Sequence, residues 1–195
     1  MSSATSTPTK RSELIRAMDA GLAPSFTFFW KPTAPKGQDN EALGPWVYSQ
    51  WYPSAFRVDG VHYATAEHFM MAAKARLFGD DETLAQILAA EHPAQVQRLG
   101  RRVRGFREPA WESERFAIVV AGSLAKFSQD PALARCLLDS GEQTLVEASP
   151  QDRIWGIGRR AEDPAALDPR QWRGENLLGF ALMVARERLA TRPDS

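Results

Sequence analysis

Apolar residues recur every three to four positions through most of the chain after residue 64, a period that predicts amphipathic helices. The predicted helices cover residues 66–78, residues 81–91, a segment opening at Pro93, residues 111–127, a segment opening at Pro131, and residues 174–190. Thr65 and Asp130 are placed to cap two of these helices, and Gly79 is placed to end the first. The segment 111–127 is predicted to be a central helix.

The β-prone stretches are short. They are "FTFFW" (26–30), the residues around 46–48, the two sides of the Asp59-Gly60 dipeptide, and the pair "QTLVEAS" and "RIWGIG" within 143–158. Asp59-Gly60 is the strongest two-residue hairpin signal in the chain. Because the strands do not alternate regularly with the helices, the predicted fold class is α+β, mainly α: a single compact helical domain with a few short strands.

The length and composition of the chain fit one domain. With 195 residues, of which 44% are hydrophobic, the chain can bury a hydrophobic core without a disulfide or a structural metal. Residues 1–24 are small, polar and punctuated by proline, so we predict a flexible N-terminal tail with room for one helical turn around "SELIRAM". The folded domain is predicted over 25–191, and 192–195 form a C-terminal tail.

Charge narrows the possible partners. The 24 basic and 24 acidic residues give a formal net charge of zero, so binding to nucleic acid would require a local cationic cluster. Neither a signal peptide nor a run of about 18 apolar residues is present. The single cysteine, Cys136, lies in an apolar run and cannot form an internal disulfide. We therefore expect a cytoplasmic protein with no membrane contact and no obligate protein partner.

Several common chemical motifs are absent. The chain has no phosphate-binding loop, no dinucleotide fingerprint, no nucleophile elbow and no H-E-x-x-H motif. His62, His68 and His92 lack the spacing and the cysteine partners of a zinc site. We expect neither a metal nor another cofactor.

Glu67 and Lys74 lie seven residues apart in the predicted helix 66–78. Seven residues turn a helix through about 700°, so the two side chains share a face and stand roughly 10 Å apart along the axis. One interpretation is that each charge complements the helix dipole at its own end. The other is catalytic, because a partly buried lysine loses its proton readily and can attack a sugar carbon while a carboxylate moves protons.

The segment "EASPQDRIWGIG", residues 147–158, could hold a ligand. Asp152 lies in a turn, Trp155 offers a face on which a base can stack, and Gly156 and Gly158 allow close approach to the backbone. An Asx turn at Asp152 and a bulge at the glycines would explain the same residues without any ligand. This segment alone leaves both interpretations open.

Two further clusters are candidates for binding. Five arginines lie within ten residues without an acid among them: Arg98, Arg101, Arg102, Arg104 and Arg107. Guanidinium groups match phosphate geometry, although a solvated helix face is the more common explanation of such a run. In the loop "YSQWYPSAF", Gln50, Trp51 and Tyr52 suit a flat heterocycle, or they anchor the core.

Taken together and in this order, the motifs resemble those of the NADAR family, the group of YbiA-type N-glycosidases. The resemblance runs from "YSQW" and "ATAEHFMMAAKARLFGD" through "LGRRVRGF" and "LVEASPQDRIWGIG" to "WRGENLLG". It implies a compact, largely helical N-glycosidase domain. Glu67 and Lys74 match two of the family's motifs, Asp152, Trp155 and Gly156 match its D-x-x-W-G, and Asn176 matches its G-x-N-l-L-G. Gln50 stands where many members have asparagine.

The resemblance also implies a reaction. Lys74 would form a Schiff base with a ribose, with Glu67 and Asp152 moving protons. Trp155, Gly156, Asn176, Gln50, Trp51 and Tyr52 would hold the substrate, and Arg101 and Arg102 its phosphates. Two substrates are associated with the family: ADP-ribose on guanine, in nucleotide or nucleic acid, which we favour, and phosphoribosylamino-pyrimidine intermediates of riboflavin synthesis. The alternative from another class is a non-catalytic module that binds ADP-ribose or NAD.

Overall fold

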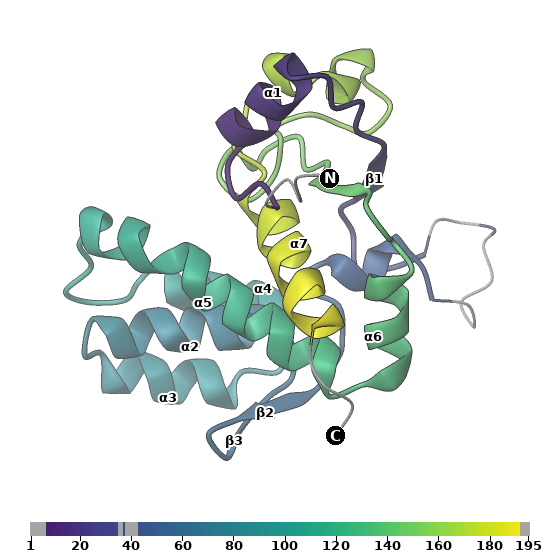
Figure 1. The fold of residues 1–195 in the computed structure, drawn as a ribbon. Helices are drawn as coiled ribbons and strands as arrows, with labels where there is room; N and C mark the ends of the chain where they lie inside the picture. The colour runs from purple at the N-terminus through teal and green to yellow at the C-terminus, as the bar shows by residue number, and fades with distance from the viewer. Residues whose placement is uncertain (1–6, 35–36, 38–42, 192–195) are drawn as a thin grey trace.

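The structure is a computed structural model, and it describes residues 7–34, 37 and 43–191 (Figure 1). Its α-helices are α1 (Arg11–Asp19), α2 (Ala66–Leu77), α3 (Asp81–Ala89), α4 (Pro93–Gly100), α5 (Glu108–Ser128), α6 (Pro131–Leu138) and α7 (Leu177–Ala190). Its strands are β1 (Phe26–Phe29), β2 (Phe56–Val58), β3 (Val61–Tyr63) and β4 (Thr144–Glu147). The 3-10 helices are η1 (Pro45–Tyr48), η2 (Pro164–Leu167) and η3 (Pro169–Gln171). The predicted fold class, mainly α with a few short strands, is confirmed.

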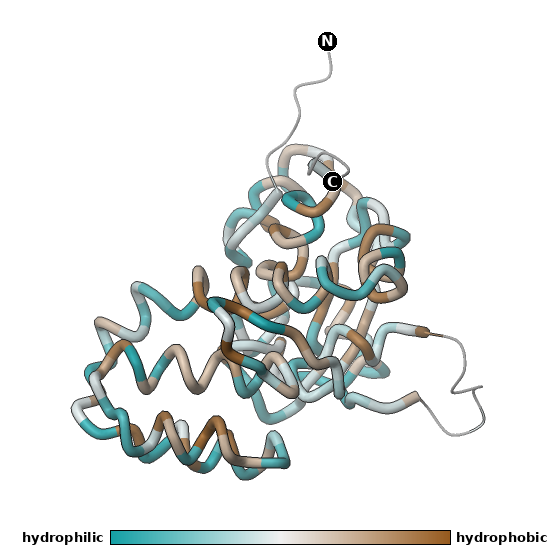
Figure 2. The backbone as a smooth tube through the Cα atoms, turned by 90° about the horizontal axis from the view of Figure 1, so that it is seen from below, coloured by the Kyte–Doolittle hydropathy of each residue, from teal (hydrophilic) through white to brown (hydrophobic). Residues whose placement is uncertain are grey.

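Helices α2, α3, α4 and α5 lie side by side, and α7 packs against both α5 and β4 (Figure 1). Polar and apolar positions alternate along the helical segments of the chain (Figure 2), as expected of helices with one buried face. Phe127 and Phe180 are among the largest fully buried side chains, so the core lies where α5 meets α7. No helix among the described residues is long and apolar enough to cross a membrane.

The predicted hairpin and helix ends are confirmed. Strands β2 and β3 pair antiparallel, and both turn residues have positive φ, 51° at Asp59 and 76° at Gly60, as a type I′ turn requires. The Thr65 side chain accepts a hydrogen bond from the His68 N–H at the start of α2, and Asp130 caps α6. Gly79 follows α2 with a φ of 66°. Local sequence therefore determines these boundaries.

Two predicted strands are wrong. Residues 45–48 form η1, which opens at Pro45, and residues 153–158 form bends. The backbone of this second segment accepts hydrogen bonds from the start of α7 and the residue before it: the Asn176 N–H donates to Gly156 O and the Leu178 N–H donates to Trp155 O. Strand β4 instead pairs in parallel with β1.

Helix α1 contains the helical turn predicted around "SELIRAM", but it is packed against the domain, which corrects the prediction of a flexible tail for this helix. Leu14 is fully buried, and Arg11 Nη1 donates to Trp172 O at 2.9 Å. The partners of α1 lie more than 150 residues away, so local composition does not reveal them. The predictions for residues 1–6 and 192–195 lie outside the described residues.

Candidate active site

A cavity of about 570 Å³ opens along α2, from Glu67 to Lys74, and its volume is typical of small-molecule sites. Its walls come from the loop after β1, the segment after η1, α2, α4, α5 and the segment 147–155. Four tryptophans line it: Trp30, Trp51, Trp111 and Trp155. Its charged lining residues are Glu67, Glu147, Asp152, Lys31, Lys74 and Arg101. The cavity therefore combines flat apolar surfaces with acids and bases.

Most of the predicted site residues meet in this cavity, although they come from segments far apart in the sequence. Those that line it are Lys74, Glu67, Asp152, Gln50, Trp51, Arg101 and Trp155. Those that do not line it are Tyr52, Arg102, Gly156 and Asn176. The structure thus places Glu67, Lys74 and Asp152 on one cavity. Four of the residues predicted to bind substrate lie outside the cavity lining.

Glu67 lies in the first turn of α2 and is buried, with 3% of its surface exposed. Its backbone N–H donates to Gln50 O at 3.0 Å, which fixes the loop carrying Gln50 and Trp51 against the helix. Burial, with a smaller contribution from nearby Asp152, raises the pKa of the Glu67 carboxyl to about 8. A hydrogen bond from Trp51 and the charge of Arg101 act in the opposite direction. Glu67 can therefore exchange a proton near neutral pH.

Lys74 is half-buried, and its Nζ donates to Gly100 O at 2.9 Å. The same Nζ lies 4.2 Å from the centroid of the Phe106 ring. Burial lowers the pKa of the ammonium, while Glu108 opposes the shift. Helix α4 comes close enough for this contact because residue 100 is glycine: an added Cβ would lie 2.0 Å from Met71 Sδ. The amine is thus held at the cavity wall and deprotonates more readily than a solvated lysine.

Asp152 takes part in a turn and lines the cavity. Its Oδ1 accepts hydrogen bonds from the N–H groups of Ile154 and Trp155, both at 2.8 Å. This is the Asx-type turn that the sequence allowed. The turn holds Trp155 beside the Asp152 carboxylate, and both residues line the cavity. The structural and the ligand-binding interpretations of this segment are therefore compatible.

Glu147, which ends strand β4, is a site residue that the sequence reasoning did not assign. Its Oε2 is shielded from solvent and has no hydrogen-bond partner within the described residues. Burial, together with the charges of Asp152 and Glu67, raises the pKa of this carboxyl to about 8. The sequence shows an acid at the end of the β-prone run "TLV", but only the packing shows that its carboxyl oxygen is shielded without a partner.

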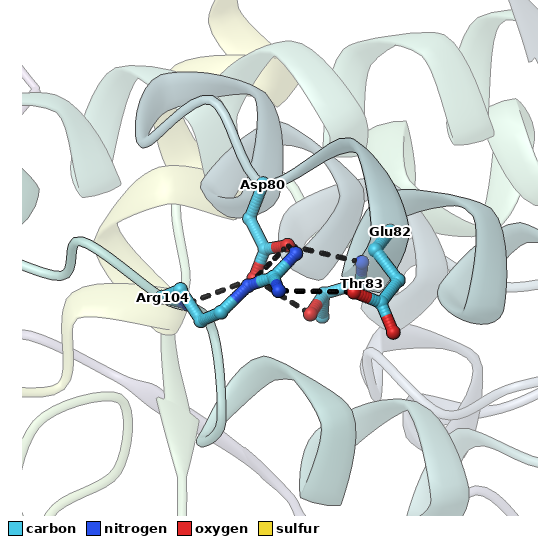
Figure 3. Close-up of polar contacts among 4 residues, drawn as sticks. All are labelled: Asp80, Glu82, Thr83 and Arg104. Atoms are coloured by element: carbon cyan, nitrogen blue, oxygen red, sulfur yellow. Dashed lines mark hydrogen bonds and ion pairs between the residues drawn. The ribbon is translucent and has the colours of Figure 1, made fainter.

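The arginine cluster is divided by the fold. Figure 3 shows Arg104 bound to Asp80 and Glu82: its Nη2 lies 2.7 Å from Asp80 Oδ1 and its Nη1 lies 2.9 Å from Glu82 Oε2. The Arg104 guanidinium holds the pKa of the Asp80 carboxyl well below its usual range. Arg102 is exposed and lies off the cavity wall. Of the arginines that we expected to hold phosphate, only Arg101 lines the cavity, and Arg104 instead ties the loop before α5 to the start of α3.

The other three reassigned residues have structural contacts. Asn176 is fully buried, and its side chain donates to Leu145 O and accepts from the Glu147 N–H, both at 2.9 Å. A Cβ at Gly156 would lie 2.8 Å from Glu147 O, so glycine is needed for close packing against β4. Tyr52 packs near the buried ammonium of Lys126. Asn176 and Gly156 therefore pack against β4 and support Glu147.

The histidines are not arranged around a ligand. His68 is buried, with Nδ1 2.8 Å from Thr65 Oγ1 and Nε2 3.0 Å from Ala90 O. Within the part of the chain that the structure describes, no three His, Cys, Asp or Glu side chains are grouped so that they could hold a metal ion.

Comparison with known proteins identifies the family. The model of the NADAR domain matches residues 28–190, which is most of the chain. The chain belongs to the NADAR family. It is 42% identical over 156 residues to "N-glycosidase R617" of Acanthamoeba polyphaga mimivirus, covering 77% of this chain and 92% of that protein. A "Riboflavin biosynthesis protein VVA0006" of Vibrio vulnificus is 31% identical over 141 residues, covering 72% of this chain and 35% of that protein.

A solved structure supports the same assignment. The NMR structure of the E. coli protein YbiA superposes on this NADAR domain with a TM-score of 0.66 and 26% sequence identity, covering 87% of each chain. As a sequence, E. coli "N-glycosidase YbiA" is 31% identical over 144 residues, covering 73% of this chain and 81% of YbiA. The predicted family and the predicted enzyme class, an N-glycosidase, are confirmed.

Proposed function

We propose that this NADAR domain hydrolyses the N-glycosidic bond between the ribose of ADP-ribose and the amine of guanine, in a nucleotide or a nucleic acid, through a Schiff base on Lys74. The proposal is carried by one observation: a half-buried amine with a lowered pKa lines the same cavity as buried carboxyl groups and four tryptophans. No metal is required by this chemistry.

The chain's own groups account for each step. The neutral Lys74 amine attacks the anomeric carbon, the carbon–nitrogen bond breaks, and its electron pair leaves with the amine, which takes up a proton. Glu67 accepts a proton from the Lys74 nitrogen and returns it to the ring oxygen as the sugar opens to the Schiff base. Water then adds to that carbon, and collapse of the adduct releases the sugar and regenerates Lys74.

The helix geometry allows Glu67 to assist Lys74. The two residues are separated by roughly 10 Å along the α2 axis, and a lysine side chain in a helix extends back toward the N-terminus. Release of Lys74 Nζ from Gly100 O would let the amine extend toward Glu67. The contact to Gly100 therefore represents a resting position of the nucleophile.

The binding groups suit a base and a diphosphate. The tryptophans offer faces on which a flat heterocycle can stack, and Gln50 offers an amide to its edge. Arg101 and Lys31 line the cavity and can each take one phosphate. Similarity to VVA0006 favours a second candidate, a phosphoribosylamino-pyrimidine, for which a single cation would suffice.

The test measures turnover of two substrates. ADP-ribosylated guanosine is followed by release of ADP-ribose, and the phosphoribosylamino-pyrimidine by release of ribose phosphate. We expect release from the guanine substrate, with loss of more than about 1,000-fold in the Lys74→Ala variant, as for removal of a covalent nucleophile. Faster turnover of the pyrimidine would show that the phosphoribosylamino-pyrimidine, and not the guanine adduct, is the substrate. Binding of ADP-ribose without release from either substrate would show a non-catalytic module.

A further inference from the structure

Three carboxyl groups from different elements face the cavity: Glu67 on α2, Glu147 at the end of β4, and Asp152 in the loop that follows. They are close enough that the charges of Glu67 and Asp152 both act on Glu147. Like charges in a shielded site cannot all be present at low cost. At least one of the three is therefore neutral when the cavity is ready to react.

Glu147 is the member of this cluster with the least support for a negative charge. Its Oε2 is shielded and has no hydrogen-bond partner within the described residues, and a buried ion without a partner is strongly disfavoured. Glu67 differs, because a Trp51 hydrogen bond and the charge of Arg101 both favour its ionised form. The two environments therefore separate the roles: both carboxyls have a raised pKa, but Glu67 has groups that favour loss of its proton, whereas Glu147 has none among the described residues and is the better placed of the two to hold a proton.

The backbone around Glu147 is fixed on both sides. Its N–H donates to Asn176 Oδ1 at 2.9 Å, and its C=O accepts from the Ile157 N–H at 2.9 Å. The position is also in register with Phe29 of β1. A carboxyl group mounted on a strand held in this way is preorganised, which is what a proton donor in an active site requires.

We propose that Glu147 is the general acid that protonates the departing amine, an inference that rests on the proposed function. As the carbon–nitrogen bond breaks and its electron pair moves to nitrogen, the Glu147 O–H bond breaks and the proton joins that nitrogen. The amine leaves neutral, and Glu147 becomes a carboxylate. The water that later adds to the Schiff base gives up a proton to Glu147, which restores the starting state.

The deciding experiment compares two leaving groups on the same ribosyl group: the guanine amine, which needs a proton, and 4-nitrophenolate, which does not. Glu147→Gln should lower kcat/KM for the amine by about 100-fold or more, the usual contribution of a general acid, and change the nitrophenyl glycoside by less than about fivefold. The matched control is Glu142→Gln, the same change at an exposed position five residues earlier, which should affect neither substrate. Activity of Glu147→Gln on the nitrophenyl glycoside also reports that the variant is folded.

A pH profile of the wild-type protein gives a second readout without any variant. The rate on the amine substrate should fall above pH about 8, where Glu147 loses its proton, and the nitrophenyl glycoside should lack this fall. Equal losses on both substrates in Glu147→Gln, or no loss on the amine, would overturn the role of Glu147. The proposed function fails separately, if wild-type protein forms no borohydride-trapped adduct on Lys74 with either substrate.

Discussion

Replacement of Asn176 should destabilise the domain more than a typical substitution does. The residue is fully buried, and it has a φ of 56°, a left-handed conformation that few non-glycine residues adopt. Its side chain bridges two backbone groups of β4, Glu147 N–H and Leu145 O. No other residue type supplies an acceptor and a donor in that geometry while tolerating this backbone so well.

The expected magnitude follows from these contacts. Asn176→Gly removes both hydrogen bonds, and each buried backbone group left unpaired costs about 1–3 kcal/mol. The glycine variant should therefore lose about 2–6 kcal/mol of unfolding free energy, a large part of the about 5–15 kcal/mol typical of a domain. Asn176→Ala loses the same hydrogen bonds and adds about 1–2 kcal/mol, because alanine disfavours the left-handed conformation.

Urea denaturation of the two variants and the wild-type protein measures both effects. With a slope of about 2–3 kcal/mol per M, the midpoint should fall by about 0.7–3 M in Asn176→Gly and further in Asn176→Ala. Asn176→Asp is the matched control, since it keeps an acceptor for Glu147 N–H but loses the donor to Leu145 O. A loss below about 1 kcal/mol in the glycine variant, or an alanine variant as stable as the glycine one, would refute this reasoning.

Three further predictions concern the site and its supports. Arg101→Ala should raise KM for the ADP-ribosyl substrate about 10-fold with little change in kcat, whereas Arg102→Ala should change neither; steady-state kinetics at two salt concentrations checks this. Lys126→Met should lower the free energy of unfolding by about 1–3 kcal/mol, seen as a lower Tm, because Val47 O loses its hydrogen bond from Nζ, while Ser49 O keeps only the one from the Tyr52 N–H. Glu147→Gln should gain stability relative to wild type as pH rises from about 5 to 8, since the wild-type carboxyl has a raised folded-state pKa and its favourable contribution is lost over that range. Thermal melts at both pH values measure the difference, and a constant difference would contradict it.

Local signals in the sequence were sufficient for most of the helices. The cap at Thr65, the prolines that open α4 and α6, and the Asp59-Gly60 turn each act within a few residues, so the sequence predicts them directly. Helix α1 and the parallel β1–β4 pair were not predictable in this way. Both depend on partners more than 100 residues away in the chain.

The candidate site was predictable to the same extent. The helical spacing indicated that Glu67 and Lys74 share a face, and the structure places both on one cavity. Residue type alone did not distinguish Arg101 from Arg104, because the difference lies in the ion pair of Arg104 with Asp80 (Figure 3). The importance of Glu147 depends on the absence of a partner for a buried oxygen, which only the packing reveals.

The central claim is that Lys74 becomes covalently attached to the sugar. Incubation with ADP-ribosylated guanosine and borohydride, followed by peptide mass mapping, tests it most directly. The account predicts one reduced ribosyl adduct on the peptide that contains Lys74. The adduct should be lost in Lys74→Ala and retained, at saturating substrate, in Lys31→Ala, which removes a lining lysine that we propose contacts a phosphate and not the sugar carbon. Turnover without a trapped adduct, or an adduct on another lysine that persists in Lys74→Ala, would contradict it.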